Sequence, residues 1–573
     1  MGGRETTHAG QGRGGWRGIL FRCAAVVLAV LPFVLLEGGL RFLGMGQPTD
    51  HPDPLSGFSR NLPLFERQGA VYRTSPAREP FFPPQEFPAE KPPHGFRIFC
   101  LGGSTVHGHP YQSDTAFPKW LEMELAGSDP GRVFQAVNCG GVSYASHRLA
   151  PIVKEVLSYQ PDLIIVATGE NEFLEDRTYQ SLKSRSAVRA RIEDAVYSLR
   201  ILNLARNWMH GRQWEGTSPE FREDGKAQLP REVRTRLDER SGYASYHRDD
   251  AWHDRVTMQF EESIRAMVEM CREAGVPIIL VKPGSNLRDC PPYKSEHRPG
   301  LAPGEENAWQ AAFEAATAAE DNDLESALAL YRKAEAVDGE YALLAYRIAR
   351  VLDRLGRKNE ALEYYLKARD QDICPLRINK RNEEILSRIA AETKTPLLDA
   401  ASLLAGKSPD AIPGNNWYLD HVHPTIGGHQ KIAQAIAGRM RDLGMVASTA
   451  TWPEHKRQEA YTRQLERLGP GYLADGRRRV GWLENWARRE RLLDETLPKD
   501  SRGYLHAGFR RLDLGDDDGA WEAFAEALKR DGGAVERLGE HAKELVSQGR
   551  QAVAKRLWQW LGDSAPGKEL PGK

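Results

Sequence analysis

The stretch Phe96-Arg-Ile-Phe-Cys-Leu-Gly-Gly-Ser104-Thr105 decides the fold. It begins as a short run of apolar, aromatic and β-branched residues, which is typical of a buried β-strand. Two glycines end the run, and a serine follows where a strand would give way to a helix. Backbone N–H groups point outward at a helix start and favour negative charge. Ser104 is therefore either a helix N-cap or a nucleophile whose oxyanion binds those amides.

Four more segments have the pattern of strands with helices between them. The strands are predicted at 133–138, 163–168, 277–282 and 395–399, and the helices at 116–125, 148–158 and 255–274. Apolar strands that alternate with helices are typical of a parallel sheet covered on both faces. We therefore predict an α/β fold, a three-layer sandwich around a parallel, flavodoxin-like sheet of about five strands. The functional site of such a sheet lies beyond the carboxyl ends of its strands.

The overall composition is that of an ordinary globular protein. The 573 residues are 27% charged and 40% apolar, and the net charge is −1. Because there is no excess of basic residues, we do not expect a nucleic-acid partner. The six cysteines lack CxxC spacing, so a zinc site or a disulfide framework is not expected. A bond between Cys290 and Cys374 stays open.

The N-terminal segment has the pattern of a membrane anchor. Arginines precede an apolar run, and counting from Ile19 to Leu43 gives the ~20 residues that a membrane span needs. No small-x-small cleavage site follows, which favours an uncleaved signal-anchor at 18–43 over a signal peptide. A buried helix of a soluble protein is the alternative. The positive-inside rule predicts a cytoplasmic tail at 1–17 and a single-pass protein whose catalytic domain is extracytoplasmic.

The rest of the chain divides by composition. Residues 44–95 are rich in proline and are predicted to be an extended spacer. The α/β domain is predicted at 96–300, with a cap-like insertion at 174–250, and it resumes at 373–446. A second insertion at 301–372 separates these two parts. Residues 447–573 are predicted to form a C-terminal helical domain.

The insertion at 301–372 contains an internal repeat. Ala327-x-x-x-Tyr331-x-x-Ala334 returns 34 residues later as Ala361-x-x-x-Tyr365-x-x-Ala368, a period that resembles tetratricopeptide repeats. Ala520-x-x-x-Phe524-x-x-Ala527 carries the same signature in the C-terminal domain. Such repeats either bind a protein partner or buttress the catalytic domain.

Polar residues with catalytic potential follow the predicted strands. Asp420 precedes His423 by three residues, so its carboxylate can fix the imidazole tautomer and leave Nε2 as a general base. A metal site formed by Asp-His-Val-His and a structural histidine are the alternatives. Asn171 lies in a Gly-x-Asn-Glu turn, where its amide either donates to an oxyanion or stabilises the turn.

These blocks together resemble the SGNH hydrolases, the GDSL-type esterases and lipases, over about Phe96–Val446 apart from the insertions. Gly102-Gly-Ser104 matches the first block, with Gly103 where the family has aspartate. Gly169-x-Asn171 and Asp420-x-x-His423 match the third and last blocks.

The second block departs from the family pattern. Alignment of Asn138-x-Gly140 puts Ser143 where the family has a glycine that donates its backbone N–H. An amide survives this change if Ser143 adopts the required backbone angles. Gly140 and Gly141 are the other candidates for this donor.

The resemblance implies acyl transfer without a cofactor or a resident metal. Ser104 would attack an ester, with His423 as the base and Asp420 orienting it, while amides and Asn171 hold the oxyanion. We expect a membrane-anchored esterase outside the cytoplasm, with an O-acetylated glycan as a candidate substrate. The alternatives are an O-acetyltransferase of exported polysaccharide with the same triad, and a non-catalytic binding scaffold.

The stretch Pro283-Gly-Ser-Asn286-Leu-Arg288-Asp289 follows the fourth predicted strand of the sheet. It would face the same edge as the catalytic segments. Asn286 and Arg288 are therefore candidates for binding a polar or anionic substrate group, and Arg377 is a candidate to join them. The alternative is a loop that satisfies its own hydrogen bonds.

Overall fold

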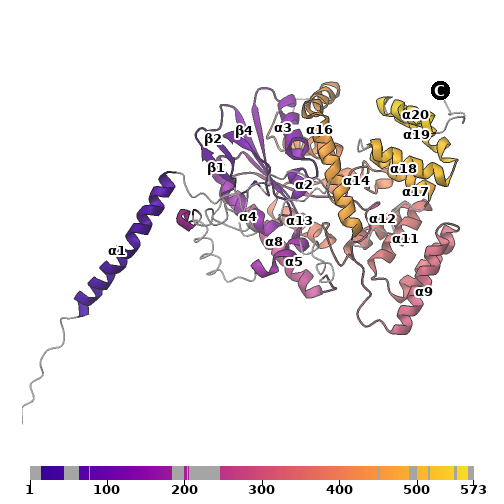
Figure 1. Cartoon of the computed structure of the whole chain (residues 1–573), viewed down its shortest axis with the longest axis horizontal. Helices are drawn as coiled ribbons and strands as arrows, with labels where there is room; N and C mark the ends of the chain where they lie inside the picture. Colours follow the sequence, from indigo (N-terminus) through magenta and orange to yellow (C-terminus); the bar gives the residue numbers. More distant parts are fainter. Residues whose placement is uncertain are drawn as a thin grey trace, which may run out of the picture. The chain divides into compact units, whose positions relative to one another are not determined.

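A five-stranded parallel sheet forms the centre of the computed structural model (Figure 1). Its strands are β4 (Gly95–Gly102), β5 (Val133–Gly140), β6 (Leu163–Ala167), β7 (Ile278–Lys282) and β8 (Leu397–Asp399). Their order across the sheet is β5-β4-β6-β7-β8, and every neighbouring pair is parallel. The predicted α/β fold and its five parallel strands are thus confirmed.

The structure describes residues 15–43, 63–76, 78–79, 81–183, 199–202, 204, 246–447, 452–489, 500–513, 517–547 and 551–564. The chain divides into two units. One comprises residues 1–63, 75–80 and 184–220, and the other comprises residues 64–74, 81–183 and 221–573. The sheet belongs to the second unit. Most of the cap-like insertion predicted at 174–250 lies outside the described residues.

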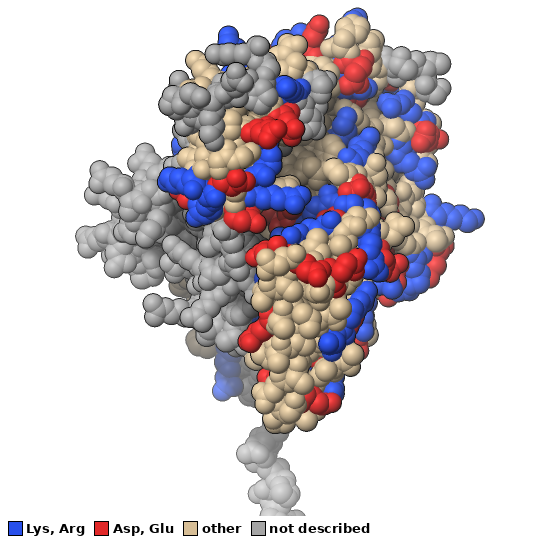
Figure 2. Space-filling view, turned by 90° about the vertical axis from the view of Figure 1, so that its right-hand side faces the viewer, with Lys and Arg blue, Asp and Glu red and all other residues tan. Residues whose placement is uncertain are grey.

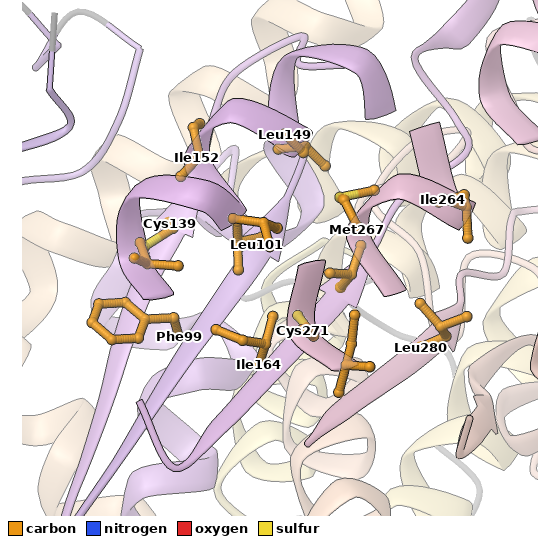
Figure 3. Packing of buried hydrophobic residues seen from close by; sticks show 14 of the residues in the cluster. Phe99, Leu101, Cys139, Leu149, Ile152, Ile164, Ile264, Met267, Cys271 and Leu280 are labelled. Atoms are coloured by element: carbon orange, nitrogen blue, oxygen red, sulfur yellow. The ribbon is translucent and has the colours of Figure 1, made fainter. Parts of the chain in front are cut away.

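Two helical layers cover the sheet. On one face lie α4 (Ser146–Val156), α8 (Asp250–Glu273) and α13 (Lys380–Thr393), and on the other lie α3 (Phe117–Ser128), α14 (Ala400–Ala405) and α15 (Ile426–Asp442). Side chains of β4 alternate between the two cores: Phe99 and Leu101 point to the first, and Ile98 and Cys100 to the second. Figure 3 shows the first core, where Phe99, Leu101 and Ile164 meet apolar side chains of α4 and α8. This alternation explains why the strands are apolar throughout.

The proline-rich segment differs from the spacer predicted at 44–95. Its described part forms an antiparallel sheet of β1 (Phe65–Gln68), β2 (Val71–Thr74) and β3 (Glu86–Pro88). Phe65 and Phe87 are buried in the first core, and the Arg97 guanidinium donates to the Pro88 carbonyl at 2.8 Å. Proline is compatible with short edge strands of this kind, so composition alone was misleading here.

The insertion at 301–372, called the repeat insertion below, is helical. It contains α9 (Pro303–Ala319), α10 (Leu324–Val337), α11 (Ala342–Arg354) and α12 (Lys358–Asp370). The alanine–tyrosine–alanine positions of α10 and α12 are buried in its own apolar core. Figure 2 shows the face of the molecule that lies on the right-hand side of Figure 1. Basic and acidic side chains are interspersed on this face.

The C-terminal region begins with a long helix, α16 (Glu454–Arg489), which bends at Gly469 and Pro470. It is followed by α17 (Ser501–Asp513), α18 (Asp517–Arg530), α19 (Ala534–Ser547) and α20 (Gln551–Ser564), which share an apolar core. Residues 447–573 were predicted to form a C-terminal helical domain, and α16 also packs on the catalytic core, since its Tyr461 lies in the core formed by α3 and α15.

The N-terminal helix α1 spans Gly15–Phe42. Phe21, Leu28 and Phe33 are among its exposed apolar side chains. By length and apolar content, none of the helices in the described residues qualifies as a membrane span.

Candidate active site

Ser104 lies at the carboxyl end of β4 and is the first residue of the short helix α2 (Ser104–His107). The two preceding glycines are required by close packing. A Cβ on Gly102 would lie 2.1 Å from the Ala167 carbonyl oxygen, and one on Gly103 would lie 2.3 Å from Nδ2 of Asn171. The N-cap of α2 is Gly103, so the interpretation of Ser104 as a helix N-cap is wrong.

The structure brings Ser104, His423 and Asp420 into one hydrogen-bonded chain. Oγ of Ser104 lies 2.8 Å from Nε2 of His423, and Nδ1 of His423 lies 2.6 Å from Oδ2 of Asp420. Ser104 and His423 are only 7% and 6% exposed. These partners are 319 residues apart in sequence, and the arrangement is that of a nucleophile, a base and an orienting acid.

The turn that carries Asp420 and His423, called the catalytic turn below, is held by its own hydrogen bonds. Oδ1 of Asp420 accepts from the backbone N–H groups of Val422 and His423, at 2.9 and 2.8 Å. The Leu419 N–H donates to the His423 carbonyl at 2.8 Å. Burial alone would raise the pKa of Asp420, but His423, His421 and these hydrogen bonds outweigh it and hold the pKa well below its ordinary value. Asp420 is therefore an anion beside His423.

Four other histidines lie near His423, of which His109 and His429 are buried and His107 and His421 are partly buried. Burial lowers the pKa of His107 and of His421 to about 4, and that of His429 to about 3. Burial and the neighbouring His423 charge lower the pKa of His109 well below its ordinary value, and the two rings lie 5.1 Å apart. These histidines are neutral at pH 7, so they do not compete with His423 for the Asp420 charge.

Asn171 lies beside the nucleophile, after the end of β6. Its Nδ2 donates to the Tyr144 carbonyl at 3.3 Å and is the atom nearest to a Cβ built on Gly103. Because a side-chain amide has two N–H donors, one remains for an oxyanion.

The end of β5 and the loop after it contain the three candidates for a second oxyanion donor, and their hydrogen bonds distinguish them. The Gly140 N–H donates to Oδ1 of Asn138, and the Gly141 N–H donates to the Gly102 carbonyl, both at 2.9 Å. Ser143 has a φ of 60°, which is the left-handed conformation that favours glycine. In the part of the chain that the structure describes, no hydrogen bond is donated by the Ser143 N–H. Of the three amides, Ser143 alone combines glycine-like angles with an uncommitted donor.

Two glutamates at the start of α5 (Glu172–Lys183) hold the segment that follows Ser143. Glu172 accepts from the backbone N–H and the hydroxyl of Ser146, at 2.9 and 2.8 Å, and Glu175 accepts from the Ala145 N–H at 2.6 Å. Sequence reasoning missed Glu175 as part of the site. Its only local signal is an acidic first helical turn, which is common and identifies no partner.

Glu170 is another buried acid that sequence reasoning missed. Its Oε1 accepts from the hydroxyl of Thr105, the residue that follows the nucleophile, at 2.8 Å. Burial raises the pKa of Glu170, although Thr105 and the nearby His423 act in the opposite direction.

The candidate substrate-binding residues lie away from the reacting atoms. The Asn286 side chain is 1% exposed and donates to the Asp420 carbonyl at 3.0 Å, so it lies behind the catalytic turn. Arg288 pairs with Asp353 and Asp410, and Arg377 donates to the Asn286 and Cys290 carbonyls. These contacts with protein groups agree with the alternative of a loop that satisfies its own hydrogen bonds, and a role of the three residues in substrate binding stays a prediction.

Both ring nitrogens of His423 are bonded to protein side chains. Within the described residues, no group of His, Cys, Asp and Glu side chains is arranged as a metal site. Cys374 lies in an apolar cluster, and Cys290 packs against that cluster.

No family model and no curated protein matches the chain. Among solved structures, a lipolytic protein of the G-D-S-L family from Desulfitobacterium hafniense DCB-2 is similar at 12% identity, with a TM-score of 0.25, over 60% of this chain and 98% of that one. Axe2, an acetylxylan esterase from Geobacillus stearothermophilus, is similar at 13% identity, with a TM-score of 0.26, over 61% and 94%. A GDSL-like lipase from Bacteroides thetaiotaomicron VPI-5482 is similar at 11% identity, with a TM-score of 0.22, over 61% and 88%. Because these identities and TM-scores are low, we infer function from the geometry of the site alone.

Proposed function

We propose that this protein is a serine esterase of the SGNH type that cleaves acyl esters through Ser104, His423 and Asp420. The carrying observation is the chain of hydrogen bonds from Ser104 Oγ to His423 Nε2, at 2.8 Å, and from His423 Nδ1 to Asp420 Oδ2, at 2.6 Å. The intact triad argues against a purely non-catalytic scaffold, which would require none of these contacts.

In the acylation step, Ser104 Oγ attacks the ester carbonyl carbon and its proton passes to Nε2 of His423. The carbonyl oxygen becomes an oxyanion, and Asp420 stabilises the imidazolium. When the tetrahedral intermediate collapses, the bond to the alcohol oxygen breaks and the alcohol leaves with the proton from Nε2. The backbone amides of Ser104 and Ser143 and the side chain of Asn171 are the proposed oxyanion donors.

In the deacylation step, a water molecule gives a proton to Nε2 of His423 and its oxygen attacks the acyl carbon. Collapse breaks the acyl–Oγ bond, Ser104 regains its proton from His423, and the acid leaves. A sugar hydroxyl in place of water would make the same site an acetyltransferase.

The proposed substrate is an ester of a small acyl group, with O-acetylated glycans as the substrate class. The support is steric, since the nucleophile and the base are each less than a tenth exposed. Product analysis with an acetylated glycan and an acceptor sugar separates hydrolysis from transfer.

The first prediction is that Ser104→Ala lowers the rate of hydrolysis of 4-nitrophenyl acetate by on the order of 10³-fold or more, because the nucleophile is lost. Release of nitrophenol by the purified full-length chain measures this. Retained turnover by the alanine variant would overturn the nucleophile assignment.

We also infer that the protein is attached to a membrane through residues 18–43, with the catalytic unit on the extracytoplasmic side. The support is the exposure of Phe21, Leu28 and Phe33 on α1, since exposed apolar clusters favour an apolar phase. We expect the chain to remain in the membrane fraction after a carbonate wash. Release into the supernatant, or removal of the N-terminus, would contradict the anchor.

A protein partner for the repeat insertion also stays a prediction. Cross-linking of the full chain in its native membrane, followed by mass spectrometry of adducts on α9 to α12, would test it.

A further inference from the structure

The loop after β7 connects the repeat insertion to the catalytic turn. Leu287 of this loop and Ile412 of the segment before Asp420 are both buried in the apolar core of the repeat insertion. The Leu287 and Arg288 N–H groups donate to the Pro413 carbonyl at 3.0 and 3.1 Å. The two segments are therefore joined to each other and to the insertion.

Asn286 holds the catalytic turn from behind. Its Nδ2 donates to the Asp420 carbonyl at 3.0 Å and to Oδ1 of Asn415 at 2.9 Å. Its backbone N–H donates to the His421 carbonyl at 2.9 Å. Oδ1 of Asn286 accepts from the Asp289 N–H at 3.0 Å, which fixes the side chain with its donors toward Asp420. Asn286 thus holds the backbone carbonyls of His421 and of Asp420, the residue that orients His423.

Asn286 is in turn fixed by the segment that leaves the repeat insertion. Nη1 of the buried Arg377 donates to the Asn286 and Cys290 carbonyls at 3.0 and 2.9 Å. The buried carboxylate of Asp372 accepts from the Tyr293 N–H at 2.7 Å and lies 3.5 Å from Nη2 of Arg377. Displacement of this segment would move Asn286.

A second connection reaches the inside of the repeat insertion. Nε and Nη2 of Arg288 donate to the two carboxylate oxygens of Asp353 on α11, at 2.8 and 3.1 Å. The Tyr346 hydroxyl, also on α11, donates to the Arg288 carbonyl at 2.8 Å. Two-pronged contacts between arginine and carboxylate restrict orientation as well as distance.

We propose that Asn286 is a positioning residue through which the repeat insertion sets the place of the catalytic acid. The inference rests on the proposed esterase function and adds to it that α11 and the loop after β7 act on the triad through Asn286. Small displacements of catalytic groups can cost about 10²-fold in rate. Loss of the Asn286 contacts therefore lowers kcat, whereas substrate binding, which involves other groups, changes little.

The test measures kcat, KM and the pH profile of kcat/KM for 4-nitrophenyl acetate with full-length variants. Asn286→Ala, and the isosteric Asn286→Asp, which lacks the donor, are expected to lower kcat by about 10- to 100-fold with KM within about twofold. In Asn286→Ala the displaced Asp420 stabilises the imidazolium less, so the acid limb of the profile moves to lower pH. Asn382→Ala is the matched control, since Asn382 is a buried asparagine of α13 whose backbone N–H bonds to Asn379 rather than to the catalytic turn.

The connection between the repeat insertion and the loop after β7 is tested with Arg288→Met and Asp353→Asn. Each is expected to lower kcat in the same direction, and Arg288→Met is expected to add little once Asn286 is replaced, because both act along one route. Lys367→Met is the control, because its ion pair with Glu335 lies inside the repeat insertion. Circular dichroism and thermal unfolding establish that each variant is folded, and if Asn286→Ala does not fold, the aspartate and Arg288 variants decide.

Wild-type kcat and pH profile in the Asn286 variants, with Ser104→Ala inactive, would overturn this inference and leave the esterase function standing. Activity retained by Ser104→Ala would overturn the esterase function and, with it, the inference. Equal losses in the Asn382 and Asn286 variants would also overturn the inference, because they would indicate general destabilisation.

Discussion

At the scale of single residues, His423 is where the polar contacts of the site meet. Its two nitrogens bridge Ser104 and Asp420, and four neutral histidines lie around it. Because these histidines are neutral, Asp420 is the hydrogen-bonded charge that stabilises an imidazolium. The change in protonation that catalysis requires is therefore localised on one ring.

Ser143 offers a test of the oxyanion donor that does not depend on its side chain. Ser143→Gly is expected to keep kcat within about threefold, because the backbone N–H is retained, and to stabilise the fold by about 1 kcal/mol, because φ is +60°. Ser143→Pro removes the N–H and is expected to lower kcat on the order of 10²-fold or more. Kinetics and urea unfolding measure both effects.

Since proline is also incompatible with this φ, Ser143→Ala serves as the control. It keeps the N–H and should resemble the wild type in kcat. A large kcat loss in the alanine variant would assign the role to the hydroxyl and contradict the backbone-donor assignment.

At the scale of elements, the site consists of loops that leave neighbouring strands at the same edge of the sheet. β4 leads to Ser104, β5 to Ser143, β6 to Asn171 and β7 to Asn286. Asp420 and His423 lie on the segment before α15. The loops are held by helices outside the sheet: α5 by its glutamates, and the repeat insertion through Arg288 and Asp372. The geometry of the catalytic site therefore depends on elements that carry no catalytic residue themselves.

Asp372, which joins the end of α12 to the loop after β7, makes this junction sensitive to pH. Burial raises the pKa of Asp372 from 3.8 to about 6, although Arg377 and three backbone N–H groups oppose it. The pKa of Asp372 is higher in the folded protein than in the unfolded chain, so folding favours the protonated carboxyl. The contribution of protonated Asp372 to the free energy of unfolding is therefore full below about pH 3.8 and is lost as the pH rises through about 6.

Relative to Asp372→Asn, whose side chain does not titrate, the wild type is expected to lose on the order of 3 kcal/mol of unfolding free energy between those limits. Urea unfolding of both proteins at pH 4 and pH 7 measures the difference. A difference independent of pH would mean that the carboxyl titrates normally in the folded protein.

At the scale of the whole molecule, α16 connects the C-terminal region to the catalytic core. Before its bend, the Tyr461 ring packs 4.6 Å from that of Trp120. After the bend, the Tyr472 hydroxyl lies 3.0 Å from that of Thr115, and Nε of Arg479 donates to the Pro110 carbonyl at 2.5 Å. α16 therefore covers the segment that follows the nucleophile.

Tyr461→Ala is expected to lower the unfolding free energy by about 3–5 kcal/mol, because it leaves a cavity against Trp120. Tyr461→Phe keeps the ring and loses the hydrogen bond to buried Glu124, so a loss of about 1–3 kcal/mol is expected. Urea unfolding measures both losses. A loss below about 1 kcal/mol in the alanine variant would show that α16 does not share this core.

Much of the fold was predictable because the signals were local. Apolar strands, the glycines before Ser104 and the 34-residue repeat are each visible within a short window. The Asp420–His423 pair is likewise a single turn, closed by its own hydrogen bonds. The sheet at 65–88 was missed because its strands are only three or four residues long and lie in a proline-rich segment, where tertiary packing overrides composition.

The sequence by itself determined the parallel α/β sheet, the order of the polar blocks along it and the residue types of the triad, since these depend on periodicity and spacing. Only the tertiary structure decided which groups meet. It separated Ser143 from Gly140 as the uncommitted amide, placed Asn286 against the backbone of the catalytic turn, and packed α16 on the core. The physical reason is that each of these depends on a hydrogen bond or contact between segments remote in sequence, and local pattern does not identify the partner.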